Sequence, residues 1–447
     1  MCPARLGKLK TSFLGERRVQ AAPIGRTAQA LDKAGPLEPV DEARQSALAQ
    51  QRAIGEFAHA QPPVLCAVEE QQHLELVERQ PVGLDELAIE LVDERGVDPD
   101  EATPGLPLPR FGCLRNSLHT QIVQCVEQFR RICRKGESYR MRFEGVHHVT
   151  CITGDAPGNV DFYVRVLGLR LVKKSVNQDD PTVYHLFYAD DQGSAGADIT
   201  FFEYPGARRG RAGDGMIHTI TFRVADAGAL DFWEARLGAE GVATRRDGDR
   251  LGFDDPEGLG LELAAVATND APLVAFNPEI PEAHAIQGFD GVRAFGSAPE
   301  RSRPLLEEVM GFEARDGTTW ELRGASRGGM FGYDPPPASG PGVPGAGTVH
   351  HVAWSSTMAD HEEWQRRVTE AGYRPTPVID RFWFRSVYFR EPSGVLFELA
   401  TLGPGFGVDE DADHLGEALI LPPAFEHLRA QVEKVLTPIH NPREDWR

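Results

Sequence analysis

Phe143–Thr153 reads FEGVHHVTCIT, and this stretch decides the fold because similar stretches recur along the chain. Its alternating pattern and its β-branched residues predict a strand. A helical stretch follows at Asn159–Leu167 and ends at Gly168, a residue type that commonly terminates helices. Three more strand-like segments complete the unit, namely Leu169–Val176, Val183–Ala189 and Asp198–Tyr204. The sequence therefore predicts a unit of one strand, one helix and three strands.

The same unit recurs three more times. The later copies begin at Gly215–Val224, Phe289–Phe295 and Gly347–Ser355. Their expected helices are Ala229–Leu237, Arg303–Met310 and Ala359–Ala371, and their expected last strands are Leu259–Ala265, Met330–Tyr333 and Gly394–Leu402. One unit cannot bury both faces of its sheet, whereas two units side by side can form a curved sheet around a concave site. Four βαβββ repeats thus predict an α+β fold of two paired-repeat domains.

Consecutive repeats are expected to pair, which sets the domain organisation. The first domain is expected at residues 141–267 and the second at residues 284–402. A linker at 268–283, rich in Pro, Asn and acidic residues, is expected between them. The tail, residues 403–447, is expected to contain one helix near Pro423–Leu436.

Residues 1–140 differ from the rest in composition. They hold five of the six cysteines and no tryptophan, while all six tryptophans lie at Trp233 or beyond. Three interpretations stay open: a small helical domain, a loosely ordered extension, or upstream sequence translated from a start codon placed too early. Met141 directly precedes the first well-patterned strand, which favours the third interpretation.

Composition and charge exclude several classes of function. The chain has 447 residues and a formal net charge of −20, which disfavours a nucleic-acid-binding groove because phosphates would be repelled. No apolar run is long enough to span a membrane, and no secretory signal pattern opens the chain, so a cytoplasmic location is expected. The cysteines include no CxxC pair, so neither a zinc ribbon nor a disulfide framework is predicted.

Two histidine pairs and one glutamate carry the chemical signal. His147-His148 opens the first repeat and His350-His351 opens the fourth, at the same place in each unit. Neighbours in a strand point to opposite faces, so one histidine of each pair is expected to face a cavity. Glu398 lies within the apolar strand GVLFELA, where a lone carboxylate is costly unless it is paired or bound to a metal. Two imidazoles and one carboxylate suit a divalent metal, and a facial triad of this type points to non-haem Fe(II).

The repeats resemble the vicinal oxygen chelate superfamily, which includes glyoxalase and the extradiol dioxygenases. Residues 141–430 more closely resemble ring-cleaving dioxygenases of the hydroquinone type. The matching stretches are GVHHVTCITGDAPGNVDFYVRVLGLRLVKKSVNQDD (145–180), YHLFYADDQGSAG (184–196), TVHHVAWS (348–355) and DRFWFRSVYFREPSGVLFELAT (380–401). Residues 1–140 have no counterpart in this resemblance.

The resemblance implies an activity and a set of site residues. It implies an Fe(II)-dependent enzyme, with Mn(II) as the alternative metal, that opens hydroquinone-like rings with incorporation of O2. It places the metal on His148, His351 and Glu398. The residues it places around these ligands are His147, His350, Thr150, Arg381 and Tyr388. Tyr388 is expected to reach a bound phenolate and Arg381 to balance the charge of that phenolate. The expected partners are the aromatic diol and O2, and no nucleic-acid or membrane partner is expected. The oligomeric state is left open, a homo-oligomer included.

Two alternatives from other functional classes stay open. Glu203, in the last strand of the first repeat, lies where glyoxalase-type enzymes place a fourth ligand, and four ligands would favour isomerase or lyase chemistry. A binding protein without turnover is the other alternative. His218 and Glu262 occupy comparable positions in the second repeat, but the third repeat offers Arg293 where a histidine would be needed, so no second metal site is expected. Weaker candidates are a structural His284 and an aromatic pocket wall of Trp354, Phe382, Trp383 and Phe384.

Overall fold

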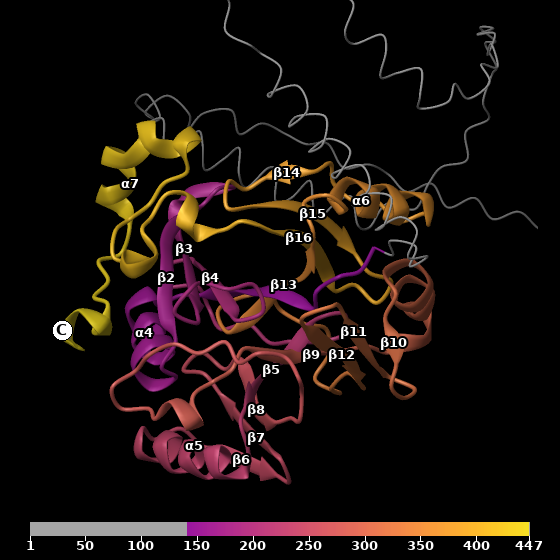
Figure 1. The fold of residues 1–447 in the computed structure, drawn as a ribbon, viewed down its shortest axis with the longest axis horizontal. Helices are drawn as coiled ribbons and strands as arrows, with labels where there is room; N and C mark the ends of the chain where they lie inside the picture. Colours follow the sequence, from indigo (N-terminus) through magenta and orange to yellow (C-terminus); the bar gives the residue numbers. More distant parts are fainter. Residues whose placement is uncertain (1–140, 447) are drawn as a thin grey trace, which may run out of the picture.

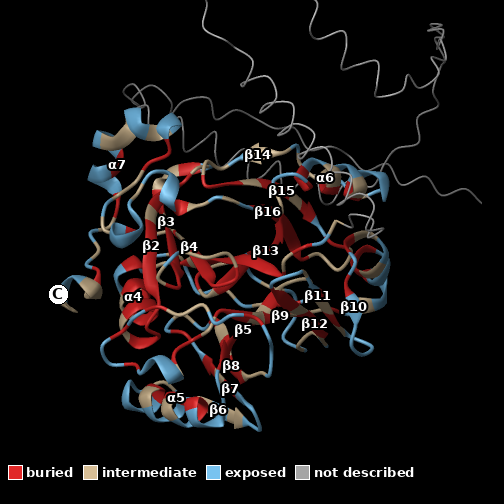
Figure 2. Ribbon diagram, in the orientation of Figure 1, coloured by how far each residue is buried: buried red, intermediate tan, exposed pale blue. Residues whose placement is uncertain are grey.

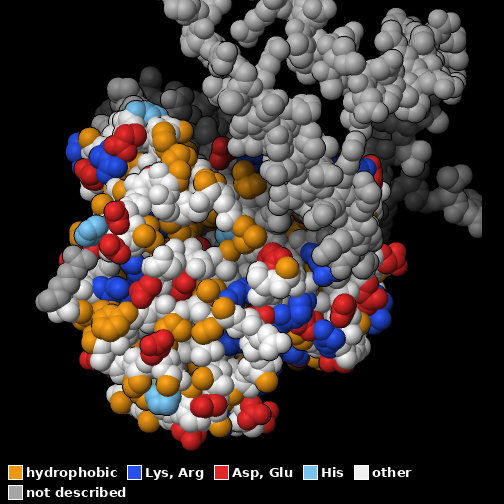
Figure 3. Space-filling model, viewed as in Figure 1, with side chains coloured by type: hydrophobic (Ala, Val, Ile, Leu, Met, Phe, Trp, Pro, Cys, Tyr) orange, Lys and Arg blue, Asp and Glu red, His pale blue; other side chains and the backbone are white. Residues whose placement is uncertain are grey.

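The computed structural model describes residues 141–446, which form two curved sheets with a few helices packed around them (Figure 1). The interpretations of residues 1–140 lie outside the described residues. No helix in the described part of the chain is both long and apolar enough to cross a membrane. On the face seen in Figure 3, basic and acidic side chains are intermingled rather than gathered into one basic surface.

The first repeat has the predicted order of elements. These are β1 (Val146–Thr153), α4 (Ala156–Val160) with a π-helical continuation η1 (Asp161–Val166), β2 (Arg170–Asn177), β3 (Asp180–Ala189) and β4 (Asp198–Glu203). The helix begins because the side chain of Asp155 accepts a hydrogen bond from the Gly158 amide at 3.2 Å. Gly168 follows it at φ +75°, a conformation that glycine adopts without strain.

The other three repeats follow the same plan. The second contains β5 (Ile217–Val224), α5 (Ala227–Ala239), β6 (Thr244–Asp247), β7 (Arg250–Asp254) and β8 (Gly260–Ala265). The third contains β9 (Phe289–Phe295), the π-helix η4 (Pro304–Met310), β10 (Glu313–Ala314), β11 (Thr319–Arg323) and β12 (Gly328–Asp334). The fourth contains β13 (Thr348–Ser356), α6 (His361–Glu370), β14 (Ile379–Asp380), β15 (Phe384–Arg390) and β16 (Leu396–Pro404). The predicted α+β fold of βαβββ repeats is therefore confirmed.

The expectation that consecutive repeats share a sheet is wrong. One sheet has the order β14-β15-β16-β13-β1-β4-β3-β2 and joins the fourth repeat to the first, while the other joins the third to the second. The segments 204–216 and 335–347 carry the chain between the sheets and lie side by side, with isolated bridges between Arg209 and Ala346 and between Arg211 and Val343. Any two repeats could bury the inner faces equally well, so the hydrophobic period does not specify the partner.

Buried residues gather along both sheets and on the inner sides of the helices (Figure 2). The tail adds the short helices η5 (Phe406–Val408), η6 (Ala412–His414), η7 (Pro423–Leu428), α7 (Arg429–Val435) and η8 (Pro442–Trp446). Its residues 405–420 cover the edge of β2, because the Ile420 amide donates to the Lys174 carbonyl at 2.9 Å. The first sheet therefore does not expose that edge strand for pairing with another chain.

Lys173 on β2 fixes the tail to the first sheet. Its buried ammonium lies 2.7 Å from a carboxylate oxygen of Asp409 and also pairs with Glu410. We expect Lys173→Met to lower the free energy of unfolding by about 3–5 kcal/mol, because two carboxylates lose their buried cation. The matched change Lys174→Met removes a hydrogen bond to the Glu417 carbonyl and weaker attractions to Glu444 and Glu410, and should cost about 1.5 kcal/mol or less. Urea unfolding of both variants measures this, and equal losses would contradict the role given to Lys173.

Candidate metal centre

The two histidine pairs lie on β1 and β13, the antiparallel neighbours at the centre of the first sheet. Val146 pairs with Trp354 and His148 with Ala353, so His147 is an extra residue in a β-bulge. On the other strand, His351 pairs with Thr150 and Val349 with Cys151, so His350 is the extra residue there. A bulge interrupts the alternation of side chains. The expectation that the neighbouring histidines point to opposite faces is therefore wrong, and each pair is close enough to hydrogen-bond.

His148, His351 and Glu398 come together into one buried group. Their ligand atoms are 3.2 Å apart between the two Nε2 atoms, and 3.1 Å and 2.8 Å from these to Glu398 Oε2. Ligands that are about 2.1 Å from a metal and at right angles to each other are about 3.0 Å apart. The three atoms thus fit one triangular face of an octahedral metal site, the arrangement of a facial triad.

Hydrogen bonds fix the ring nitrogen that His148 presents, and His351 has a similar neighbour. His147 Nε2 lies 3.1 Å from the Thr401 carbonyl, which can only accept, so His147 carries its proton there. His147 Nδ1 then accepts from His148 Nδ1 at 2.9 Å, which leaves the lone pair of His148 Nε2 free. His350 Nδ1 is likewise 2.7 Å from His351 Nδ1. Burial lowers the pKa of His147 to about 3, so this ring stays neutral.

Glu398 is a fully buried carboxylate that needs a cation. It pairs in register with Ala353 on β13 and with Tyr388 on β15. Burial alone would raise its pKa, but His148 and His351 hold the pKa of Glu398 well below its usual value. Its Oε1 atom has no hydrogen-bond partner among the described residues. An unpartnered oxygen of a buried carboxylate, next to two imidazole lone pairs, fits a bound divalent metal.

Tyr388 lies beside the triad, as the sequence predicts. Its ring centroid is 5.6 Å from that of His351, and its strand position is directly opposite Glu398. Burial and the neighbouring charge of Glu398 raise the pKa of Tyr388, so its hydroxyl stays protonated. The hydroxyl can therefore act as a hydrogen-bond donor at neutral pH.

Arg381 joins two ends of the first sheet. Its guanidinium is 5.5 Å from the Tyr388 ring centroid and pairs with both carboxylate oxygens of Asp179, at 3.1 Å and 2.9 Å. Gln178 also donates to the Arg381 carbonyl at 2.8 Å. These contacts bring the β2–β3 turn against the β14–β15 turn and close the curved sheet. The next residue, Phe382, has φ +73°, a strained conformation that such contacts help to hold.

We expect Arg381→Ala to raise the apparent KM for substrate by about 10-fold while metal content stays unchanged. The cause is the loss of a cation next to Tyr388, whereas the half-exposed pair with Asp179 is worth only about 0.2–1 kcal/mol of stability. Steady-state kinetics and metal analysis check this. Asp179→Asn, which breaks the same pair but keeps the arginine, is the control. If both variants raised KM equally, the pair rather than the cation near the substrate would be responsible.

Glu203 does not face the metal centre. One of its carboxylate oxygens accepts from Thr437 at 2.7 Å and from the Ala156 amide at 3.4 Å, which ties the tail and α4 together. The alternation along β4 places it on the opposite face from Thr200. In the fourth repeat, the ligand Glu398 on the last strand pairs with Ala353 on the first strand. The equivalent pair in the first repeat is Thr200 with Thr150, so Thr200 holds the place of a fourth ligand. The fourth-ligand position, predicted at Glu203, therefore lies three residues earlier, at Thr200.

The sequence interpretation missed His185. His185 on β3 lies 2.9 Å through Nε2 from Thr200 Oγ1, which donates to Thr150 Oγ1 at 2.8 Å. Thr150, expected near the ligands, is thus the end of a three-residue chain of hydrogen bonds. His185 stands in the stretch YHLFYADDQGSAG, and alternation along that strand would have placed it on the same face as Phe187. The signal was therefore present in the sequence.

The second sheet repeats this register without the ligands. It has bulges at His218 on β5 and Asp290 on β9, the positions of His147 and His350 in the first sheet. The positions of the three ligands consequently fall on Thr219, Gly291 and Gly332. His218 therefore matches a non-ligand histidine, and Arg293 matches Ala353 rather than a histidine, which corrects both assignments.

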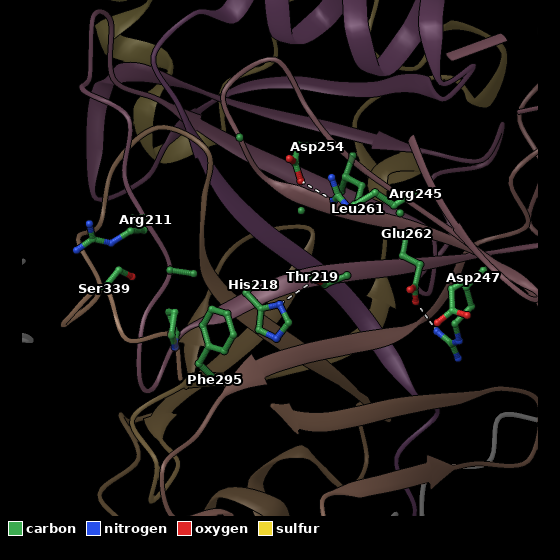
Figure 4. Close-up of a pocket in the computed structure, with 16 residues that line it drawn as sticks. Arg211, His218, Thr219, Arg245, Asp247, Asp254, Leu261, Glu262, Phe295 and Ser339 are labelled. Carbon is green, nitrogen blue, oxygen red and sulfur yellow. Dashed lines mark hydrogen bonds and ion pairs between the residues drawn. The ribbon is translucent and has the colours of Figure 1, made fainter. Parts of the chain in front are cut away.

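Ion pairs occupy the inner face of the second sheet. Glu262, at the position of Thr200, pairs with Arg250 and accepts from Thr221 at 3.1 Å. His218 Nε2 lies 3.0 Å from Asp334, which also binds Arg293. A cavity of about 610 Å³ is lined by His218, Arg250 and Glu262 together with neighbouring residues such as Arg245 and Asp254 (Figure 4). Within residues 141–446, His148, His351 and Glu398 form the one group of three such ligands close enough to share a metal.

The weaker aromatic candidates divide between site and core. Phe384 lies 5.3 Å and 5.2 Å, between ring centroids, from His147 and His148. Trp383 packs beside Lys173 and Phe406, while Phe382 touches Trp383 at the turn. Trp354 packs against Phe312, Phe331 and Phe397 on the other face of the sheet and so belongs to the core. His284 stacks on Phe232 and accepts a hydrogen bond from Trp233 through its carbonyl, which is the expected structural role.

Comparisons with known proteins agree with this architecture. The model of the Glyoxalase/Bleomycin resistance protein/Dioxygenase superfamily matches residues 145–263 and 283–399. The chain is 42% identical over 302 residues to the Bacillus subtilis protein named "Putative ring-cleaving dioxygenase MhqO", covering 66% of this chain and 96% of that one. It is 30% identical over 313 residues to chlorohydroquinone/hydroquinone 1,2-dioxygenase of Sphingobium indicum, covering 66% and 96%.

A solved structure gives the same result. The crystal structure of a Bacillus subtilis protein described as a dioxygenase has a TM-score of 0.63 and 40% identity to this chain, and covers 68% of this chain and 99% of that one. The match extends over nearly the whole of that relative. The chain therefore belongs to the Glyoxalase/Bleomycin resistance protein/Dioxygenase superfamily and, within it, to the same group as the relatives named ring-cleaving dioxygenases.

Proposed function

We propose that this protein is an Fe(II)-dependent ring-cleaving dioxygenase that acts on hydroquinone-like diols with incorporation of O2. The buried triad of His148, His351 and Glu398 carries this proposal, because its three ligand atoms fit one face of an octahedron, and a metal held by a facial triad keeps further positions for substrate and O2. Similarity to a relative named for hydroquinone cleavage supports the substrate class. Mn(II) suits the same ligands and is the alternative metal.

The metal would be held by His148 Nε2, His351 Nε2 and Glu398. When bound, Fe(II) supplies the redox chemistry by which dioxygen is joined to an aromatic ring. His147 and His350 hold the ligand rings in the required tautomer through their Nδ1 atoms. Both atoms of O2 enter the product, and one ring C–C bond next to a hydroxyl-bearing carbon breaks.

Tyr388 and the surrounding face handle the substrate. The Tyr388 hydroxyl stays protonated and can donate a hydrogen bond to a ring oxygen that becomes anionic. Arg381, close to the Tyr388 ring, adds a positive charge on the same side. Thr150 and Thr200 are fully buried, so the face opposite Tyr388 is screened from bulk water.

The alternatives have less support. A glyoxalase-like isomerase or lyase depended on Glu203 as a fourth ligand, and Glu203 instead bonds Thr437 and the Ala156 amide. Thr200 stands at the fourth position, and a hydroxyl is a poorer metal ligand than a carboxylate. A binding protein without turnover is distinguished by experiment. A cytoplasmic location stays a prediction from the sequence.

The direct test is to load the protein with Fe(II) without oxygen and to follow oxygen uptake with a panel of hydroquinones and catechols. We expect uptake of about one O2 per ring with hydroquinones. Protein loaded with Zn(II), which has no redox chemistry, is the control and should consume none. Product without oxygen uptake would favour an isomerase, and ligand binding without product would favour a binding protein.

A further inference from the structure

His185 lies on the same face of the first sheet as Thr200, and neither the metal ligands nor the proposed reaction uses it. Its Nε2 is bonded to Thr200, which occupies the register position of a fourth ligand. Thr200 donates to Thr150, so its oxygen must accept from His185, and the proton of His185 is therefore on Nε2. His185 Nδ1 is then a hydrogen-bond acceptor, and no partner for it is found among the described residues.

The position along β3 sets what His185 can reach. In the fourth repeat, Tyr388 pairs with the ligand Glu398. In the first repeat, Phe187 pairs with Thr200 in the same way, so Phe187 lies level with the metal ligands. His185 is two residues farther along the same face, about 7 Å at the rise of a β-strand. The two oxygens of a hydroquinone are about 5.5 Å apart, and a hydrogen bond of about 2.8 Å from the farther oxygen can span the remaining distance. A ring with one oxygen at the triad would thus bring its other oxygen toward His185.

Two aromatic rings pack against His185. Phe187 and Phe202 flank it, with ring centroids 3.9 Å and 4.4 Å from that of His185. Burial keeps the pKa of His185 well below its usual value, and His148, His351 and Arg381 act in the same direction. The imidazole is accordingly neutral and accepts a hydrogen bond rather than pairing with an anion. These features favour a ring substituent that donates, such as a hydroxyl.

We infer that His185 is the residue that selects diols: its Nδ1 accepts a hydrogen bond from the ring hydroxyl farther from the triad. This inference rests on the proposed function, since it assumes that one ring oxygen lies at the triad. It predicts that a phenol whose second oxygen is methylated gains nothing from His185, because a methyl ether cannot donate. The preference for a diol over its mono-methyl ether would then come from the His185 side chain.

The test measures ligand binding without oxygen, so turnover is not needed. Hydroquinone and 4-methoxyphenol are titrated by calorimetry into Fe(II)-loaded wild type, His185→Phe and, as a matched control in the second sheet, His218→Phe. We expect His185→Phe to weaken hydroquinone binding by about 5- to 100-fold, because the buried hydroxyl loses its acceptor. Binding of 4-methoxyphenol should change by less than about 3-fold, and His218→Phe should behave as wild type toward both. His185→Gln, which offers a carbonyl acceptor, should recover part of the loss.

The outcomes separate this inference from the proposed function. Equal weakening of both ligands in His185→Phe would mean a structural role, and no weakening of either would mean no contact; each result overturns the inference and leaves the dioxygenase proposal standing. If wild type itself bound neither ligand, the proposed function would fail and the inference with it. Metal analysis of each variant beforehand identifies any loss caused by an empty triad.

Discussion

Glu398→Ala is expected to remove bound metal and to lower turnover by roughly 1000-fold or more. The carboxylate is the only anionic member of the triad, and its loss leaves two neutral imidazoles to hold a divalent cation. Metal-supplied charge stabilisation is worth several kcal/mol, and each 1.36 kcal/mol is tenfold in rate. Metal content per chain after Fe(II) loading and desalting measures the first effect, and oxygen uptake measures the second. His148→Ala and His351→Ala should behave alike.

Two control variants keep this result specific. Glu203→Ala removes a buried carboxylate from the other face of the same sheet, so it should cost stability but retain metal. His218→Ala changes the bulge histidine of the second sheet, whose neighbours at the ligand positions are Thr219 and Gly291. Retention of metal in Glu398→Ala, or equal loss in all variants, would mean that the metal lies elsewhere.

Tyr388→Phe is expected to keep metal near one per chain and to slow turnover by roughly 10- to 1000-fold, the usual effect of losing a proton-transfer or charge-stabilising group. The change removes only a hydroxyl, and the ring can keep its contact with His351. Tyr373→Phe, the same change in the same repeat where the ring packs on Phe389, is the control and should leave turnover unchanged. Iron content and kcat are measured side by side. A wild-type rate would reduce Tyr388 to a packing residue, and loss of iron would mean that its hydroxyl supports the metal site instead.

The repeat could be predicted from the sequence because each unit carries its own signals. Alternation marks the strands, and glycine follows the helices, as at Gly168 and Gly311, where φ is +75° and +79°. The pairing of repeats could not be predicted, because hydrophobic alternation tells which face is buried but not which repeat buries it. The ligand set nevertheless required the first and fourth repeats to meet, since His148 comes from one and Glu398 from the other.

Two features of the site depend on register that the sequence does not display. The bulges at His147 and His350 arise from how β1 and β13 pair, so a strict period of two gave the wrong side for one histidine of each pair. Because the register was unknown, the sequence interpretation also placed the fourth-ligand position at Glu203, whereas the structure has Thr200 there. His185 was missed for a different reason. A single histidine in a strand is usually a structural residue, and only the structure shows that this one bonds to Thr200.

The mass of the product tests the central claim most directly. Fe(II)-loaded protein is given hydroquinone under labelled dioxygen, quenched rapidly, and the product is analysed by mass spectrometry. A ring-cleaving dioxygenase is expected to give a ring-opened product whose mass equals that of hydroquinone plus both atoms of labelled O2, and Glu398→Ala is expected to give none. A product of unchanged mass would contradict dioxygenase activity and favour an isomerase. The absence of any product from wild type that binds both Fe(II) and hydroquinone would also contradict it, in favour of a binding protein.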